Sequence, residues 1–148
     1  MNETIQLLQD VVRNARTGGD AVNQLMQRAE GDAMRRELNA ARTQYETIHR
    51  EAERALSANH GQPEPVNPLN RAGMWMGLNM NTLMDRSDDH IAEMVIQGAT
   101  MGVIEMTKST NTYADADPAA RAIASRFIVA QQGIIDKQKA YLSNRVHA

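Results

Sequence analysis

The sequence predicts an all-α fold, an up-down four-helix bundle made of two antiparallel hairpins with an extra short crossing helix. Apolar residues recur at intervals of three and four along nearly the whole chain, which is the spacing of one helix face. Three of the four prolines stand within residues 63–68, and the fourth, Pro118, stands where a helix is expected to begin. A chain of 148 residues with 42% hydrophobic residues can bury the core of one domain, here residues 1–148.

The first hairpin is predicted over residues 3–57. Asn2 is expected to cap a helix over residues 3–29, Gly31 to close it in a left-handed conformation, and Asp32 to cap the next helix. Because the connection is so short, the two helices should be antiparallel neighbours. The apolar faces consist of Ile5, Leu8, Val12, Ala15, Gly19, Val22, Met26 and Ala29 in the first helix, and Met34, Leu38, Ala41, Tyr45, Ile48, Ala52 and Ala55 in the second.

The middle of the chain is predicted as an extended connector over residues 58–68, followed by a crossing helix over residues 69–84. A single helix over residues 69–112 is the alternative, and at 1.5 Å per residue it would be about 65 Å long. Such a helix would extend far beyond its neighbours and leave a methionine-rich half uncovered. The sequence therefore favours a break near residues 85–87.

The second hairpin is predicted over residues 87–143. Ser87 is expected to cap its first helix, which runs to about Thr112, with two aspartates in the first turn where the helix dipole favours negative charge. Asp117 caps the second helix and Pro118 takes its first position. Residues 144–148 are expected to form a frayed tail. The apolar face of the last helix consists of Ala120, Ile123, Phe127, Ala130, Ile134 and Tyr141.

Composition excludes several classes of function. The net charge of −2 gives no basic face for nucleic acid. The absence of cysteine excludes disulfides, thiol catalysis and thiolate metal sites, and it is typical of a reducing cytoplasm. No apolar stretch approaches the roughly 20 residues that span a bilayer, and no basic region precedes an apolar run at the N-terminus. A cytoplasmic protein that binds neither membrane nor nucleic acid is expected.

Two segments carry a resemblance to known proteins: residues 79–84, Asn-Met-Asn-Thr-Leu-Met, and residues 90–105, His-Ile-Ala-Glu-Met-Val-Ile-Gln-Gly-Ala-Thr-Met-Gly-Val-Ile-Glu. With the helix order, they resemble the ferritin-like superfamily, and more closely small uncharacterised bundle proteins of clostridial and related Gram-positive bacteria. The resemblance implies a four-helix bundle and a metal-handling ancestry. It implies no particular activity.

Ferritin-like metal sites use an inward glutamate from each of two helices and a Glu-x-x-His motif from each of the other two. This chain has one such motif, Glu46-Thr-Ile-His49. The apolar face set by Tyr45 and Ile48 places Glu46 about 100° around the helix, toward solvent, and His49 on the flank. A solvated pair of Glu46 and His49 is therefore predicted in preference to a metal site.

His90 and Glu93 form a second candidate, since residues three apart are neighbours on a helix surface and could share a metal or a proton. A metal would need further ligands from another helix or another subunit. Asp20 and Asp136 could lie near the same level, but Asp136 is two positions from a core residue and should face outward. The favoured interpretation places His90 and Glu93 on a solvent-facing stripe with Gln97, Thr100 and Thr107.

Two pairs of glycines four residues apart, Gly73 with Gly77 and Gly98 with Gly102, call for an explanation. Glycine inside a helix costs roughly 1 kcal/mol relative to alanine, and small residues four apart form a groove that another backbone can approach. The helix over residues 88–112 also has two apolar stripes. Either the crossing helix packs there, or a second subunit does. The predicted homo-oligomer interface consists of Met74, Trp75, Met76, Met80, Gly98, Met101 and Gly102.

The sequence supplies no catalytic motif. It lacks a Gly-x-Ser-x-Gly turn, and Gly18-Gly19 stands inside a periodic helix, which indicates close packing rather than a phosphate-binding loop. We therefore predict a non-enzymatic structural or interaction module that self-associates, with no catalytic residue, no cofactor and no metal site. The alternative is a ferritin-like metal-binding protein or oxidoreductase that uses His90, Glu93, Glu46 or His49.

Overall fold

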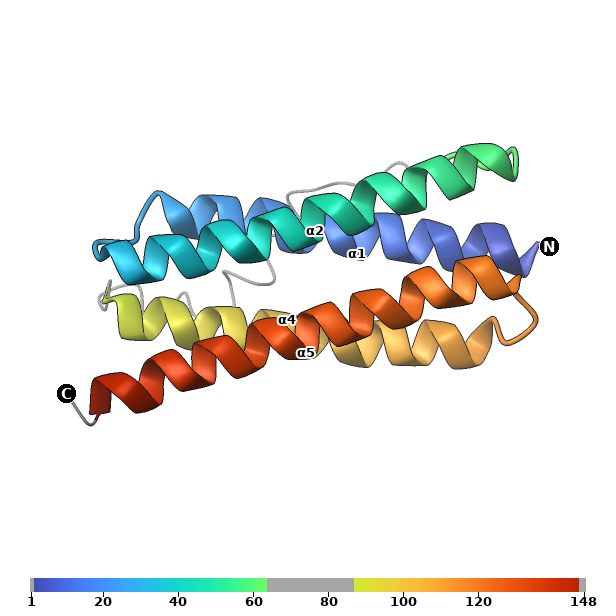
Figure 1. Ribbon diagram of the computed structural model, residues 1–148. Helices are drawn as coiled ribbons and strands as arrows, with labels where there is room; N and C mark the ends of the chain where they lie inside the picture. Colours follow the sequence, from blue (N-terminus) through green and yellow to red (C-terminus); the bar gives the residue numbers. More distant parts are fainter. Residues whose placement is uncertain (1, 64–86, 147–148) are drawn as a thin grey trace.

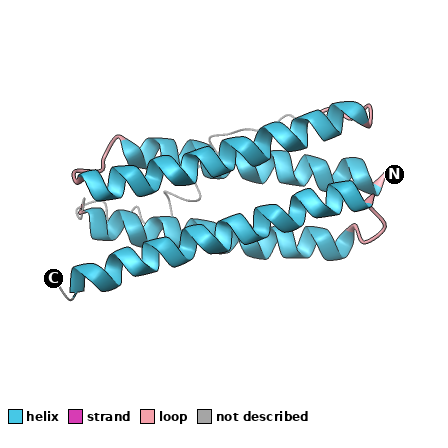
Figure 2. Ribbon diagram, viewed as in Figure 1, coloured by secondary structure: helices cyan, strands magenta, loops and turns pink. Residues whose placement is uncertain are grey.

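The computed structural model describes residues 2–63 and 87–146, and its helices form a four-helix bundle (Figures 1 and 2). The predicted all-α fold class is confirmed, and the described residues contain no strand. The predicted crossing helix over residues 69–84 lies outside the described residues. The helices are α1 (Glu3–Met26), α2 (Asp32–Ala58), α4 (Asp88–Thr112) and α5 (Pro118–Val146).

The helices pair as two antiparallel hairpins, α1 with α2 and α4 with α5, that pack against each other along their length (Figure 1). Helix α1 touches both helices of the second hairpin, and α2 touches α5. Helix α2 ends at one end of the bundle and α4 begins at the other (Figure 1).

The predicted N-terminal caps at Asn2 and Ser87 are confirmed. The Asn2 carboxamide oxygen accepts from the Ile5 backbone N–H at 3.2 Å, and the Ser87 hydroxyl accepts from the His90 backbone N–H at 3.2 Å. Each satisfies one of the backbone donors that the first turn of a helix leaves without an intrahelical partner.

The predicted turn between α1 and α2 was wrong in three respects. Helix α1 ends at Met26 rather than at residue 29, and Gly31 is extended (φ −90°, ψ 148°) rather than left-handed. Gly31, not Asp32, is the N-cap of α2. Gly31 provides no side-chain cap, and the turn before α2 is instead hydrogen-bonded to the other hairpin. The Asp88 carboxylate accepts from the backbone N–H groups of Glu30 at 2.9 Å and Gly31 at 2.7 Å.

The opposite end of the bundle repeats this arrangement. The Glu3 carboxylate accepts from the backbone N–H of Asp115 at 2.8 Å, and the Thr4 hydroxyl accepts from that of Asp117 at 2.8 Å. The first turn of each hairpin thus closes the loop of the other hairpin. We call these two sets of contacts the end clamps. At the far end of the last helix, α5 continues to Val146, so the predicted tail after residue 143 is largely helical.

The buried face of α1 is wider than predicted. Leu7, Val11, Ala21 and Leu25 are fully buried although they lie beside the predicted stripe. The reason is that α1 packs against three helices, so an arc rather than a single line of residues loses its contact with water. Of the predicted stripe, Leu8, Val12, Ala15, Val22 and Ala29 are buried, whereas Ile5, Gly19 and Met26 are half-buried.

The two hairpins have matching interiors. Tyr45 and Gln131 are each the fourteenth residue of their helix, and each lies against a glycine of the preceding helix, Gly18 and Gly102 respectively. When the sequences of the two hairpins are aligned on these residues, buried residues of one hairpin fall opposite buried residues of the other. Matching buried residues are Leu7 and Ile91, Val11 and Val95, Ala15 and Ala99, Ile48 and Ile134, and Ala52 and Gln138.

Candidate functional site

A polar pair lies at the centre of the bundle. The Tyr45 hydroxyl donates to the Gln131 side-chain oxygen at 3.2 Å, and the Tyr45 ring stands edge-on to Phe127 with centroids 5.9 Å apart. Burial raises the pKa of the Tyr45 phenol, so the hydroxyl stays protonated and remains a donor. Gln138 is buried too. Sequence reasoning missed both glutamines because this residue type is mostly found at the surface.

The glycines opposite this pair make room for it. A Cβ added to Gly18 would lie 2.6 Å from Tyr45 Cζ, and one added to Gly102 would lie 2.9 Å from Gln131 Cδ, both far inside van der Waals contact. Close packing at Gly18 was predicted, and it is packing within a hairpin. Gly102 has the same role, which gives one residue of the predicted homo-oligomer interface an explanation inside its own chain.

The rest of the predicted interface divides into two groups. Gly98 is buried in the bundle and Met101 is half-buried, and most of both apolar stripes of α4 is covered by the four helices themselves. The remaining four residues lie outside the described ranges, and their part in an interface stays a prediction. They are Met74, Trp75, Met76 and Met80.

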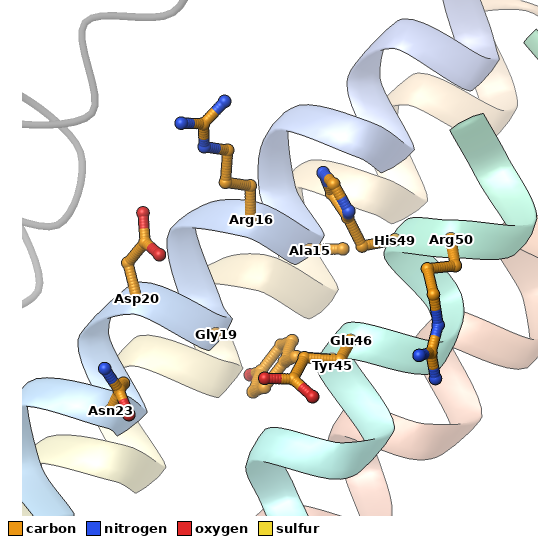
Figure 3. A pocket seen from close by; sticks show the side chains of 9 residues that line it. All are labelled: Ala15, Arg16, Gly19, Asp20, Asn23, Tyr45, Glu46, His49 and Arg50. Carbon is orange, nitrogen blue, oxygen red and sulfur yellow. The ribbon is translucent and has the colours of Figure 1, made fainter.

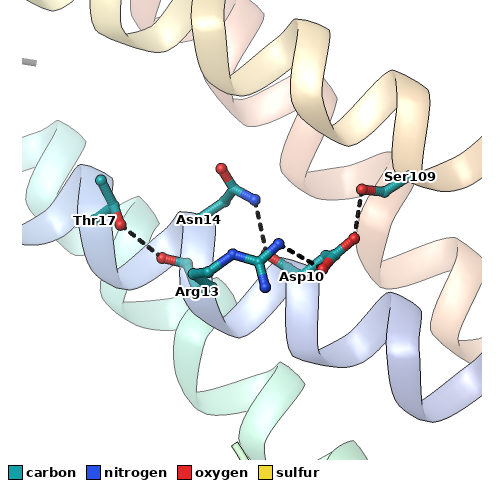
Figure 4. A network of polar contacts seen from close by, with 5 residues as sticks. All are labelled: Asp10, Arg13, Asn14, Thr17 and Ser109. Carbon is teal, nitrogen blue, oxygen red and sulfur yellow. Dashed lines mark hydrogen bonds and ion pairs between the residues drawn. The ribbon is translucent and has the colours of Figure 1, made fainter. Parts of the chain in front are cut away.

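A polar network joins α1 to α4 (Figure 4). The Asp10 carboxylate forms an ion pair with Arg13 at 2.5 Å and accepts from the Ser109 hydroxyl at 2.7 Å. The Asn14 and Thr17 side chains donate to backbone carbonyls one turn earlier in the same helix. The network therefore links the two hairpins through the hydrogen bond between Ser109 and Asp10.

Glu46 and His49 do not form the predicted pair. Glu46 points to solvent as predicted, but its carboxylate lies 3.9 Å from Arg42 Nε, and His49 Nε2 lies 3.4 Å from the Glu53 carboxylate. Each side chain has its partner one helical turn away, because ion pairs at i,i+4 bring opposite charges together on this surface.

His90 is buried, so its predicted place on a solvent-facing stripe was wrong, although the other four residues of that stripe are exposed. The reason is that Met94, one turn later on the same face, is buried as well. His90 Nδ1 lies 3.3 Å from the Glu93 carboxylate. Among residues 2–63 and 87–146, no three histidine, aspartate or glutamate side chains gather closely enough to hold a metal ion.

A groove of about 380 Å³ lies between α1 and α2 on the outside of the first hairpin (Figure 3). It has a glycine and a tyrosine ring at its centre and side chains of both charges around it. Sequence reasoning did not single it out, because charged side chains on two separate helices give no local motif. The lining residues are Ala15, Arg16, Gly19, Asp20, Asn23, Tyr45, Glu46, His49 and Arg50.

The second hairpin differs at the equivalent positions. Counting from the matched glycines and from the Tyr45–Gln131 match, Gly19, Asp20 and His49 correspond to Val103, Ile104 and Ile135. Val103 and Ile135 are half-buried, and Ile104 is 50% exposed. At these three positions the first hairpin has a glycine and two polar side chains, whereas the second hairpin has aliphatic side chains.

Comparison with protein-family models, curated proteins and solved structures finds no match to this chain. The ferritin-like resemblance therefore stays a prediction, and any functional conclusion rests on this molecule alone. None of the described helices is long and apolar enough to cross a bilayer.

Proposed function

We propose that this protein is a non-enzymatic interaction module that self-associates through the outer surface of its second hairpin, around Ile104. One observation carries the proposal: the large apolar side chain of Ile104 is half exposed on this hairpin, next to the half-buried Val103. The corresponding surface of the first hairpin is charged.

The neighbours of Ile104 extend the apolar surface. Val103 is half-buried beside it, and Ile96 is half-buried two turns earlier on the same side of α4. Single exposed aliphatic residues are common and need no explanation. In a two-fold dimer, however, each such contact occurs twice, and burial of one isoleucine contributes about 1.5–3 kcal/mol. A second copy of this chain is therefore the occupant that we propose.

The polar groups of the described interior support a structural role over a catalytic one. The Tyr45 hydroxyl is bonded to Gln131, Asp10 is bonded to Arg13 and Ser109, and the end clamps bind the loops. These groups hold the helices together. The ferritin-like alternative has no group of three metal ligands among the described residues to support it.

Light scattering on the purified full chain tests the proposal. We expect a dimer for the wild type and a monomer for Ile104→Glu, because a carboxylate at the centre of an apolar contact loses its hydration. Val129→Glu makes the same chemical change at an exposed aliphatic residue of α5, and it should remain dimeric. A monomeric wild type, or an Ile104→Glu variant that keeps the wild-type mass, contradicts the proposal.

A further inference from the structure

The outward side of α5 carries apolar and small residues that are exposed to solvent. Val129 lies near its middle and is 63% exposed. Gly133 follows one turn later on the same side, and a Cβ added there would meet nothing within 4 Å. Packing within this chain therefore does not require a glycine here, although a glycine inside a helix costs roughly 1 kcal/mol relative to alanine. The bundle alone does not explain these two residues.

Helical spacing extends this surface in both directions. Ala122 stands seven residues before Val129, and Ala140 stands seven residues after Gly133, so both lie on the same side of α5. Two opposite charges flank this line, one on each side, at 100° per residue. All six residues are exposed, and we call them the outer face of α5: Ala122, Arg126, Val129, Gly133, Asp136 and Ala140.

The outer face of α5 is symmetric about residue 131. The two alanines each stand nine residues from this point, the valine and the glycine two, and the arginine and the aspartate five. If two α5 helices pack antiparallel about a two-fold axis at this point, each residue reaches the level of the residue equally far on the other side. Alanine then lies opposite alanine, Val129 beside the open surface of Gly133, and Arg126 opposite Asp136. Each of these contacts occurs twice.

We propose that the outer face of α5 binds the same face of a second copy of this chain, with the two helices antiparallel. Charge complementarity identifies this partner. The Asp136 carboxylate forms no hydrogen bond or ion pair with any residue of the ranges 2–63 and 87–146. The Arg126 guanidinium contacts the Glu51 carboxylate at 2.8 Å in an exposed ion pair, and its other N–H groups can donate to a second carboxylate.

The matching face of α2 could not pair with itself in this way. The residues of α2 that match the two alanines are Arg36 and Arg54, and those that match the valine and the glycine are Thr43 and Thr47. All four are exposed. In the same antiparallel arrangement Arg36 would lie opposite Arg54 of a second copy, and like charges repel each other. The outward side of a helix in this bundle therefore does not need apolar residues, and α5 has them.

The contact between two α5 helices is expected to be weak. Stable protein interfaces bury roughly 1,200–2,000 Å² in total, and one helix face of mostly small side chains buries less. Association through α5 is therefore expected near millimolar protein, whereas the dimer proposed above forms in dilute solution. The inference does not rest on the surface around Ile104, because Ile104 belongs to α4. If both contacts form, dimers joined through α4 pair through α5 at high concentration.

Light scattering at increasing protein concentration tests the inference, in the Ile104→Glu variant of the full chain so that the α4 surface does not contribute. We expect the mass to double between about 10 µM and about 1 mM protein. Val129→Glu added to this variant should keep the dilute mass throughout, because two carboxylates would enter the contact. Thr43→Glu, added instead, makes a matched change at the equivalent exposed position of α2, and the mass should still double.

A constant mass of the Ile104→Glu variant overturns the inference, and so does equal behaviour of the two added substitutions. The doubling is measured against the mass in dilute solution. Its outcome is therefore separate from the question of whether Ile104 holds a dimer, which the dilute mass alone answers. Circular dichroism checks that each variant keeps the helix content of the wild type.

Disulfide cross-linking tests the direction of the two helices in the otherwise unchanged chain, which contains no cysteine. In the antiparallel pair, position 122 lies opposite position 140, whereas two copies of position 122 are about 27 Å apart, the rise of 18 residues. A disulfide needs Cα atoms within about 7 Å. Mild oxidation of mixed Ala122→Cys and Ala140→Cys proteins near millimolar concentration should therefore link the two variants to each other more than either to itself. Equal or preferred linkage of Ala122→Cys to itself overturns the antiparallel arrangement.

Discussion

In both hairpins of this bundle a glycine of one helix lies opposite a large side chain of the other, but the hairpins differ in which side chain that is. In the first hairpin, Gly18 accommodates the rigid ring of Tyr45, whereas in the second, Gly102 accommodates the flexible amide of Gln131. The two side chains meet in a hydrogen bond at the centre. Matching interiors therefore do not require matching chemistry, because a glycine opposite a large side chain preserves the spacing of the helices in both cases.

The outer surfaces differ more than the interiors. The first hairpin has a groove with charged side chains around Gly19, whereas the second has the exposed aliphatic side chain of Ile104 at the position that matches Asp20. The interior determines how closely two helices pack, but it leaves the outward residues free. We propose that the surface around Ile104 serves self-association.

The largest expected effect tests the difference between the rigid Tyr45 ring and the flexible Gln131 amide. Gly18→Ala should lower the free energy of unfolding by about 2–3 kcal/mol, because the added methyl group overlaps a ring that cannot bend. Gly102→Ala should lower it by only about 1 kcal/mol, since the Gln131 side chain can rotate away at the expense of its hydrogen bond. Urea denaturation measures both values.

A control separates packing from helix propensity. Gly133→Ala adds a methyl group in open space, and it should raise the free energy of unfolding by about 0.5–1 kcal/mol. If Gly18→Ala stabilises the protein by a similar amount, the proposed fit between Gly18 and Tyr45 is wrong. Equal losses in Gly18→Ala and Gly102→Ala would remove the distinction between the hairpins.

The second effect compares the two end clamps. Asp88→Ala should cost about 2 kcal/mol, because one charged side chain accepts both backbone donors of the α1–α2 turn. Glu3→Ala should cost about 1 kcal/mol, since at the other end Thr4 keeps the second of the two bonds. Thermal or urea unfolding measures the difference. A larger loss for Glu3→Ala than for Asp88→Ala would contradict the assignment of both turn hydrogen bonds to Asp88.

The third prediction concerns the pH dependence of stability and tests the hydrogen-bonded pair of Tyr45 and Gln131. Because burial raises the pKa of Tyr45 in the folded protein, the unfolded chain releases this proton first, at its ordinary value near 10. The stabilisation is complete below pH 10 and is lost as the pH rises toward the folded value. One unit above pH 10, wild type should have lost about 1.4 kcal/mol more than Tyr45→Phe, relative to neutral pH. Parallel alkaline unfolding curves would contradict a buried, protonated Tyr45.

Most of the fold could be predicted from the sequence. Helix periodicity, the Asn2 and Ser87 caps and Pro118 are local signals, and the structure confirms the two hairpins that they indicate. The turn at Gly31 could not be predicted, because the side chain that accepts from its backbone N–H, Asp88, is far away in the chain and reaches it only after the hairpins pack. The buried position of His90 was missed for a similar reason, since one helix cannot show how wide an arc its neighbours cover.

The candidate groove was the part least accessible to sequence reasoning. Arg16, Asp20 and His49 resemble ordinary surface charges in their own helices, and only the antiparallel register of α1 and α2 places them around one hollow. Glycine 19 was predicted to serve close packing, a role that the structure assigns to Gly18 instead.

By itself, the sequence determined where helices begin, which of their faces are apolar and that short turns pair them, because these depend on neighbours within a few residues. Only the tertiary structure decided which polar groups are used in holding the helices together and which remain available at the surface. The physical reason is that burial and hydrogen-bond partners belong to residues that are distant in the chain, as Tyr45 and Gln131 are, and these meet only in the folded bundle.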